Sequence, residues 1–328
     1  MKSTLYLYLI WISRVLKNLF TSDSNFLRIS PPRFDLYKKN RSTRVFVFDM
    51  QRKFLMKFDI NSYHDSITLD QVFSREEYQL KNLGIELKIQ KKVIKVIPNS
   101  TDTGIDDWQP SLLKYCNIKG MSITQIGDLY DEPNLVFFSL EYNKLINPKK
   151  FKSKKLYNIH FSALPKYKGM FTSIHPILND EKESGVTIHY IDSGIDTGDI
   201  IYQDKFPIDI NDTSRDLYFK YLYHGTILFK NKIKYIIESN FESYKQSQIQ
   251  SSYYSKKSIN FNNIVIDTNK TSIEIHNQLR AFIFPEYQLP QIDNYYICKS
   301  VITNENIGSN VIYQENKKLI LSGIDGFK

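Results

Sequence analysis

The chain has 328 residues, 41% of them hydrophobic and 24% charged, which is ordinary for a globular protein whose core fills one large or two modest domains. Its two cysteines, Cys116 and Cys298, form no C-x-x-C pair and no H-E-x-x-H motif occurs, which argues against a thiolate zinc site and a disulfide framework. The formal net charge of +9 favours an anionic partner, such as nucleic acid, anionic lipid or a phosphorylated or polycarboxylate ligand. We expect no metal and a reducing, cytoplasmic compartment.

Residues 1–43 are predicted to be an N-terminal extension and linker. Residues 4–13 are uncharged and largely apolar, but Arg14 and Lys17 interrupt the run before it reaches the roughly 20 residues that span a membrane. The run resembles a signal-peptide core, yet no small-residue cleavage site follows. We therefore favour an amphipathic or partly buried helix without membrane insertion.

Strands and helices are predicted to alternate from Arg44 onward. The predicted strands span residues 44–50, 85–98, 134–140, 156–160, 185–192 and 199–208. The predicted helices span residues 74–84, 106–116, 141–146, 171–178 and 212–240. The last is the strongest, with an Asp/Thr/Ser start and spaced apolar residues. The alternation predicts an α/β domain with a mostly parallel sheet over residues 44–245. A small α+β C-terminal region, with a helix over 272–284, is predicted over residues 246–328.

Asn158 and His160 lie two residues apart in the strand over 156–160, so their side chains face the same side of the sheet. At the carboxyl end of a parallel strand, that side can open on the crevice where ligands bind. A carboxamide and an imidazole could therefore meet a substrate together. The same pair is also common as an ordinary hydrogen-bonded pair.

A turn with three carboxylates, Asp192, Asp196 and Asp199, follows the strand over 185–192 and contains Gly194 and Gly198. A calcium loop would need a denser run of oxygen ligands that ends in Glu, which is missing here. Asp196 could instead approach the imidazole of the preceding motif and orient or charge it.

These motifs, in this order and spacing, resemble the N10-formyltetrahydrofolate-dependent formyltransferases. The matching pieces are Asn158–His160, the Leu-Pro-Lys-Tyr-Lys-Gly run over 164–169, the Gly-Val-Thr run over 185–187 and the turn over 192–198. Residues 277–284 resemble a motif shared by the tRNA and sugar branches of that family. The resemblance is dense over about 134–203, weak before residue 130, and implies a Rossmann-like formyltransferase domain. His175 and Asp180 depart from the family pattern.

The resemblance implies a catalytic trio of Asn158, His160 and Asp196. Formyl transfer develops an oxyanion, to which the Asn158 NH₂ and a cationic His160 can donate hydrogen bonds. A neutral His160 can instead accept the proton of the attacking amine as general base. Asp196 would hold the imidazole and bias its pKa. The sequence leaves the two roles of the imidazole open.

Two further groups of residues are predicted to bind ligands. The resemblance places the folate co-substrate against Ser139, Leu140, His189, Asp192, Gly194 and Ile195. For a nucleotide sugar we predict contacts from Lys144, Lys166, Lys168, Tyr287 and Gln288. Lys166 and Lys168 could equally be solvated turn charges, Lys144 is more often a plain surface residue, and Tyr287 and His189 could be buried for structural reasons.

The tail favours the sugar branch of the family. The tRNA branch adds a β-barrel of about a hundred residues, for which residues 251–328 are too few. The expected reaction is transfer of formyl from N10-formyltetrahydrofolate to the amine of a dTDP-linked amino-dideoxysugar for O-antigen, lipopolysaccharide or other surface glycans. Its first candidate is dTDP-4-amino-4,6-dideoxyglucose and its second the 3-amino isomer. We also expect a possible homodimer and no nucleic-acid partner. The alternatives are a methionyl-tRNA formyltransferase, a non-catalytic binding member and a nucleic-acid-binding module.

Overall fold

The computed structural model describes residues 44–49, 94–106, 109–316 and 318–328, with backbone alone for the first range. The predicted N-terminal extension and the predicted helix over 74–84 lie outside the described residues. Within the described ranges, no helix has the length and apolar character that crossing a membrane requires.

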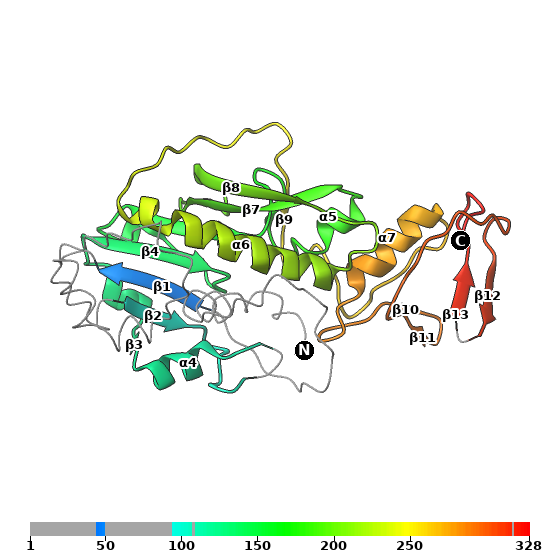
Figure 1. The fold of residues 1–328 in the computed structure, drawn as a ribbon, viewed down its shortest axis with the longest axis horizontal. Helices are drawn as coiled ribbons and strands as arrows, with labels where there is room; N and C mark the ends of the chain where they lie inside the picture. Colours follow the sequence, from blue (N-terminus) through cyan, green and yellow to red (C-terminus); the bar gives the residue numbers. More distant parts are fainter. Residues whose placement is uncertain (1–43, 50–93, 107–108, 317) are drawn as a thin grey trace, which may run out of the picture.

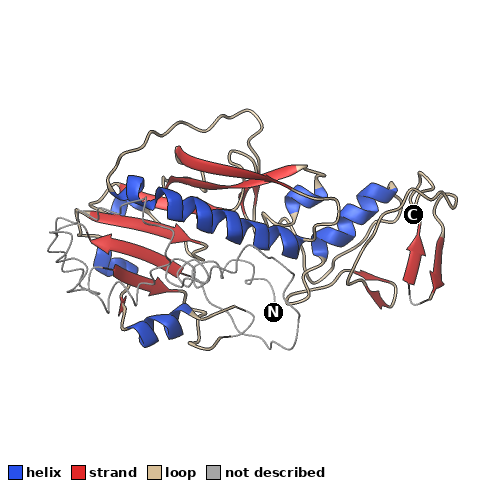
Figure 2. Ribbon diagram, in the orientation of Figure 1, coloured by secondary structure: helices blue, strands red, loops and turns tan. Residues whose placement is uncertain are grey.

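A mixed sheet forms the centre of the molecule (Figures 1 and 2). Its strands are, in spatial order, β3 (Ser122–Ile123), β2 (Ile94–Pro98), β1 (Arg44–Asp49), β4 (Leu135–Leu140), β5 (Lys155–His160), β7 (Glu183–Tyr190) and β8 (Ile200–Pro207). The β2–β3 and β4–β5 pairs are parallel, and the other four pairs are antiparallel. Only β1 and β7 therefore oppose the common direction, so five of the seven strands run the same way. The predicted α/β fold is confirmed.

The strand β4 is buried on both faces, as its continuous apolar sequence predicts. Phe137 packs against Phe151 on one face, with ring centroids 5.5 Å apart. Phe138 packs on the other face against Tyr157 and against Phe229 of α6 (Ser214–Ile237), at 5.3 and 5.1 Å. Both faces of the sheet are thus covered by apolar side chains.

The helix α6 runs along the sheet and confirms the strongest helix prediction (Figure 1). Thr213 and Asp216 form a capping box at its start, in which each side chain accepts a hydrogen bond from the other residue's backbone N–H. Its buried face packs on β7 and β8. This packing holds the outer strands β7 and β8 in place, and β7 with the turn after it forms one part of the site described below.

Three helix predictions need correction. Residues 141–146 form no helix, because Glu141 has a φ of +50° and Pro148 soon follows; a short 3₁₀ turn at Pro148–Lys150 comes next. The helix expected over 106–116 is α4 (Leu112–Lys119), which begins after Pro110 and is capped by Ser111. The helix expected over 171–178 is the shorter α5 (His175–Leu178).

The C-terminal region contains α7 (Ser272–Phe282) and two short hairpins, as expected for a small α+β region (Figure 1). The hairpins are formed by β10 (Gln291–Ile292) with β11 (Tyr295–Tyr296), and by β12 (Ile312–Glu315) with β13 (Lys318–Leu321). Its predicted boundary at residue 246 stays a prediction.

The helix α7 is held to the sheet domain through the motif over 277–284. The buried guanidinium of Arg280 donates to the carbonyl oxygens of Asp209 and Asp212, at 3.1 and 2.8 Å. Asn277 donates to Asp180 at 3.1 Å. The motif that resembles the tRNA and sugar branches thus joins the C-terminal region to the start of α6.

Candidate active site

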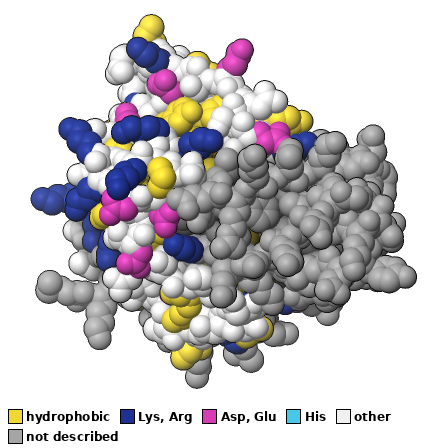
Figure 3. All heavy atoms as spheres, turned by 90° about the vertical axis from the view of Figure 1, so that its left-hand side faces the viewer, with side chains coloured by type: hydrophobic (Ala, Val, Ile, Leu, Met, Phe, Trp, Pro, Cys, Tyr) yellow, Lys and Arg dark blue, Asp and Glu magenta, His cyan; other side chains and the backbone are white. Residues whose placement is uncertain are grey.

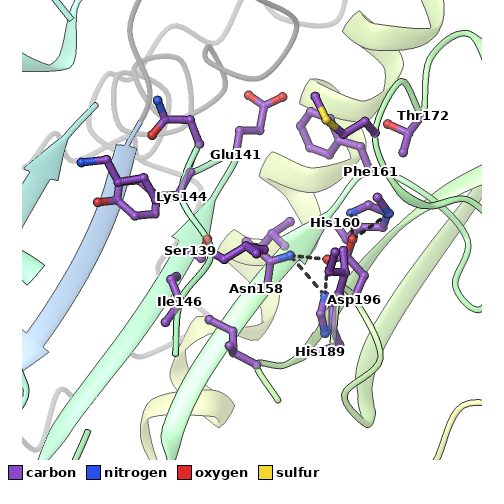
Figure 4. A pocket seen from close by; sticks show the side chains of 18 of the residues that line it. Ser139, Glu141, Lys144, Ile146, Asn158, His160, Phe161, Thr172, His189 and Asp196 are labelled. Atoms are coloured by element: carbon purple, nitrogen blue, oxygen red, sulfur yellow. Dashed lines mark hydrogen bonds and ion pairs between the residues drawn. The ribbon is translucent and has the colours of Figure 1, made fainter. Parts of the chain in front are cut away.

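The register of three neighbouring strands places three polar side chains in one row. Asn158 of β5 pairs with Ser139 of β4 on one side and with His189 of β7 on the other. His160 follows two residues later on the same face, as the period of a strand requires. Figure 4 shows Asn158, His160 and His189 converging on Asp196, which the turn after β7 supplies.

Asp196 lies at the centre of this cluster, and its side chain is only 13% exposed. Its Oδ1 accepts a hydrogen bond from Asn158 Nδ2 at 3.1 Å, and its Oδ2 accepts one from the backbone N–H of Gly169 at 2.9 Å. The Nδ1 of His160 lies 3.5 Å from Oδ2, and the Nε2 of His189 lies 3.5 Å from Oδ1. The structure therefore brings together the three side chains that the resemblance implied.

The hydrogen-bond partners define where the protons lie. His160 Nε2 faces the carbonyl oxygen of Tyr167 at 2.8 Å and must donate, because a carbonyl only accepts; Nδ1 is then the nitrogen that can take up a proton. His189 Nδ1 likewise donates to the carbonyl of Tyr190 at 2.7 Å. Its Nε2 is left to accept from Asn158 Nδ2, which lies 3.2 Å away. Both hydrogens of the Asn158 amide are thus directed at the cluster.

Burial and charge set the protonation of the central pair. Burial lowers the pKa of His160 below its usual value, against the opposing charge of Asp196, and the positive charge of Lys168 lowers it further. For Asp196, burial alone would raise the pKa, but the neighbouring imidazoles and the Gly169 N–H outweigh burial and hold it well below its usual range. At neutral pH the site thus holds a carboxylate beside a neutral imidazole.

The turn that carries Asp196 is shaped by its own side chains. Asp192 accepts hydrogen bonds from Gly194 N at 3.0 Å and from Thr197 Oγ1 at 2.7 Å. Gly198 packs so closely on the carbonyl of Tyr190 that a Cβ would collide with it. The turn therefore requires glycine at position 198.

A cavity of about 410 Å³ opens beside the cluster, within the range of small-molecule sites. In Figure 4, Ser139, Lys144 and Ile146 lie on one side of Asn158, and Phe161 and Thr172 lie on the other. We call these the β4 side and the α6 side. To the β4 side we assign Ser139 and residues 141–146, with Ile191, Asp192, Gly194 and Ile195 of the turn, and to the α6 side we assign Phe161, residues 169–173, Tyr218, Tyr253 and Lys256.

A short strand pairing, which the sequence does not predict, brings Tyr253 and Lys256 to the α6 side. The two-residue strands β6 (Lys168–Gly169) and β9 (Tyr253–Tyr254) pair in parallel. Gly169 has a φ of +86°, and a Cβ there would collide with the Tyr254 carbonyl. The Tyr254 ring stacks on His175 at 3.7 Å and on Tyr167 at 5.6 Å, and burial lowers the pKa of His175 to about 4. The departure from the family pattern at His175 is thus part of a stack.

The predicted folate-binding residues all line the cavity except Leu140, whose side chain is buried in the core. Of the predicted nucleotide-sugar residues, only Lys144 lines it, and it lies on the β4 side.

The other four predicted nucleotide-sugar residues make contacts away from the cavity lining. Lys166 pairs with Glu181 at 2.9 Å, and the buried Lys168 donates to Ser251 at 3.0 Å. The Tyr287 hydroxyl accepts from Gln109 at 3.0 Å, and the Gln288 N–H donates to a backbone carbonyl at 2.9 Å. Their ligand roles stay predictions.

Residues 136–233 match the family model described as formyl transferase. Two solved structures are similar over most of their length. One is WlaRD, described as a sugar 3N-formyltransferase in the presence of dTDP and 5-N-formyl-THF; it is 56% identical with a TM-score of 0.69, over 70% of this chain and 84% of that one. The other is an N-formyltransferase from Helicobacter canadensis in complex with folinic acid and dTDP-3-aminofucose; it is 52% identical with a TM-score of 0.71, over 77% and 92%.

Curated relatives are more distant. The methionyl-tRNA formyltransferase of Finegoldia magna is 30% identical over 64% of this chain and 69% of its own length. The bifunctional polymyxin resistance protein ArnA of Wigglesworthia glossinidia brevipalpis is 27% identical over 70% of this chain, which spans only 36% of that protein.

Together, the fold, the site and these similarities define an N-formyltransferase. The chain belongs to the formyltransferase family, and within it to the sugar N-formyltransferase branch. The predicted family, the class of enzyme and a formyltetrahydrofolate co-substrate are thereby confirmed.

Proposed function

We propose that this chain transfers the formyl group of N10-formyltetrahydrofolate to the amine of a dTDP-linked amino-dideoxysugar. The observation that carries the proposal is the Asn158–His160–Asp196 cluster at the wall of a small-molecule cavity, in a chain 52–56% identical to two sugar N-formyltransferases. Biosynthesis of a surface glycan, such as an O-antigen or lipopolysaccharide, would use such a product, and the cytoplasm supplies both substrates.

The neutral imidazole of His160 acts as the general base in this proposal. Its Nε2–H is bound to the Tyr167 carbonyl, so the amine proton is taken up at Nδ1, 3.5 Å from the Asp196 carboxylate. The carboxylate then stabilises the imidazolium that forms. Of the two roles that the sequence left open, this protonation favours the base.

Asn158 supplies the hydrogen bond to the developing oxyanion. The amide hydrogen that is bonded to Asp196 keeps the planar amide in place, and the hydrogen that faces His189 is the one available to the formyl oxygen as charge appears there. Such a donor is worth about 10²–10³ in turnover in other acyl-transfer sites.

The two sides of the cavity suit the two substrates. The β4 side offers Ile146 and Ile191 as apolar walls and the backbone of the turn over 192–196, which fits a flat pterin. The α6 side offers aromatic rings and the Lys256 cation, which fit a sugar and a diphosphate. Because Lys144 lies on the β4 side, we now assign it to the carboxylates of the folate rather than to the nucleotide.

The position of the acceptor amine is proposed from the two similar structures. WlaRD is described as a 3N-formyltransferase, and the Helicobacter canadensis enzyme holds dTDP-3-aminofucose. We therefore place the 3-amino-3,6-dideoxyhexoses first and dTDP-4-amino-4,6-dideoxyglucose second, which reverses the order expected from the sequence alone.

Methionyl-tRNA formyltransferase is the second candidate, supported by the 30% identity to the Finegoldia magna enzyme. The higher identity to the sugar enzymes disfavours it. Among the described side chains on the face in Figure 3, Lys and Arg lie interspersed with Asp and Glu, unlike the continuous basic surface that grips a nucleic acid.

The deciding experiment is a formylation assay with the purified protein and N10-formyltetrahydrofolate. The acceptors are the 3-amino and 4-amino dTDP-sugars and methionyl-charged initiator tRNA in parallel, and mass spectrometry follows the gain of one CO unit. Formylation of one sugar supports the proposal and defines the amine. Formylated methionyl-tRNA would replace it with the second candidate, and folate binding without any product would indicate a non-catalytic member.

A further inference from the structure

Asp196 adopts a backbone conformation that an L-residue seldom takes. Its φ is +54°, in the left-handed region, where surrounding contacts must compensate the strain. The direction of its carboxylate depends on that conformation, because the same residue contacts Asn158, His160 and the N–H of Gly169. Whatever fixes the backbone here therefore fixes the cluster.

A segment from beyond α6 supplies that support. Tyr244 pairs with Ile200 through two backbone hydrogen bonds of 2.9 and 3.0 Å, which anchors the segment at the start of β8. Two residues later, Gln246 Nε2 donates to the carbonyl oxygens of Asp196 and Gly198, at 2.8 and 2.7 Å. One side-chain amide thus bridges both ends of the strained stretch.

The hydrogen-bond donors of the Gln246 amide explain why this side chain lies beside the turn. Its Oε1 is buried and has no hydrogen-bond partner among the described residues, whereas both N–H groups point at carbonyls of the turn. A buried acceptor without a partner costs free energy. A side chain chosen only to fill this space would not carry that cost.

We propose that Gln246 is a positioning residue for the transfer reaction, which sets the direction of the Asp196 carboxylate by fixing the carbonyls of Asp196 and Gly198. The inference rests on the proposed function, since it acts through the general base. It assigns a role to a residue some 50 positions away from the trio member that it supports.

Gln246→Leu removes both donors at similar volume and is the principal test. Turnover is expected to fall at least tenfold, while the KM for the dTDP-sugar changes less than twofold. The acid limb of the kcat–pH profile should also move to lower pH, because a displaced Asp196 charge no longer raises the pKa of His160. Gln248→Leu, with an exposed side chain in the same segment, is the matched control and should behave as wild type.

A merely structural role would lower the melting temperature and leave kcat per folded enzyme and the pH profile unchanged, which would overturn the proposal. Should Gln246→Leu not fold, Gln246→Asn serves instead, because its shorter amide cannot reach both carbonyls; wild-type kcat and pH profile in that variant would again reject the role.

If the wild type formylates none of the acceptors, the proposed function fails separately. A crystal structure of the variant then decides on Gln246. A displaced Asp196 supports the role, and an unchanged φ with the His160 contact intact contradicts it.

Discussion

The two sides of the cavity are built from the chain in different ways. The β4 side comes from one short stretch, Ser139 and residues 141–146, and from the turn directly after β7. The α6 side combines the loop after β5 with Tyr218 of α6 and with Tyr253 and Lys256, which a short parallel pairing brings in from 85 residues further along. The cluster around Asp196 lies between the two sides. The β4 side, built from neighbouring residues, is suited to the formyl donor that the whole family shares. The α6 side, assembled from distant segments, can change with the acceptor sugar.

The largest expected effect is on kcat and comes from the cluster around Asp196, which acts on both substrates. His160→Ala removes the proposed base, so kcat should fall by about 10²–10⁴, the usual contribution of a general base. The affinity for dTDP-sugar and folate, measured by calorimetry, should remain within about threefold.

His224→Ala is the matched control for the loss of this base. His224 also lies beside a carboxylate, at 2.8 Å from Asp204, but on α6 and outside the cavity lining. Its kcat should equal that of the wild type. Retention of turnover in His160→Ala would refute the base.

The next effect separates the charge of the cluster from its shape. Asp196→Asn keeps the size of the side chain but cannot stabilise an imidazolium, so kcat should fall about 10²-fold. Because the negative charge raises the pKa of His160, its loss should also move the acid limb of the rate profile to lower pH. Asp199→Asn, in the same turn but outside the cavity lining, should change neither quantity. An unchanged kcat in Asp196→Asn would remove this carboxylate from the mechanism.

The parts of the site that could be predicted are those that follow from local sequence. Asn158 and His160 share a face because a strand has a period of two, and the apolar run of β4 announced a strand covered on both faces. The helix α6 was recognisable from its polar start and spaced apolar residues. The catalytic role proposed for Asp196 came from the resemblance to the family.

What could not be predicted depends on contacts between distant segments. Two strands of two residues each, β6 and β9, carry no periodicity, so nothing in the sequence placed Tyr253 in the cavity. The amide donors of Gln246 are directed by tertiary packing alone. The helix expected over 141–146 failed because the left-handed Glu141 redirects the chain into the cavity wall.

The wild-type pH profile gives a smaller effect, about tenfold per pH unit on its acid limb. Burial lowers the pKa of His160 from 6.5, so the imidazole is neutral and active at pH 7, and the rate should fall only below pH 6.5 as it becomes protonated. The acceptor amine titrates too, so the limb that belongs to His160 is the one that moves in Asp196→Asn. An immovable limb, or one with its midpoint above pH 6.5, would contradict the assignment of a neutral base.

The smallest expected effects test the comparison of the two sides most directly, because one lysine of the cavity lining is assigned to each side, Lys144 to the β4 side and Lys256 to the α6 side. Lys144→Ala should raise the KM for N10-formyltetrahydrofolate by up to about tenfold and leave the KM for the dTDP-sugar unchanged. Lys256→Ala should do the reverse. Both cations are exposed, so each effect should shrink as salt rises.

Lys149→Ala, at an exposed lysine outside this cavity, controls for net charge. If both variants raised the KM of the same substrate, the two sides would not divide the substrates as we propose. If each variant raised the KM of only the substrate assigned to its side, the division would be supported.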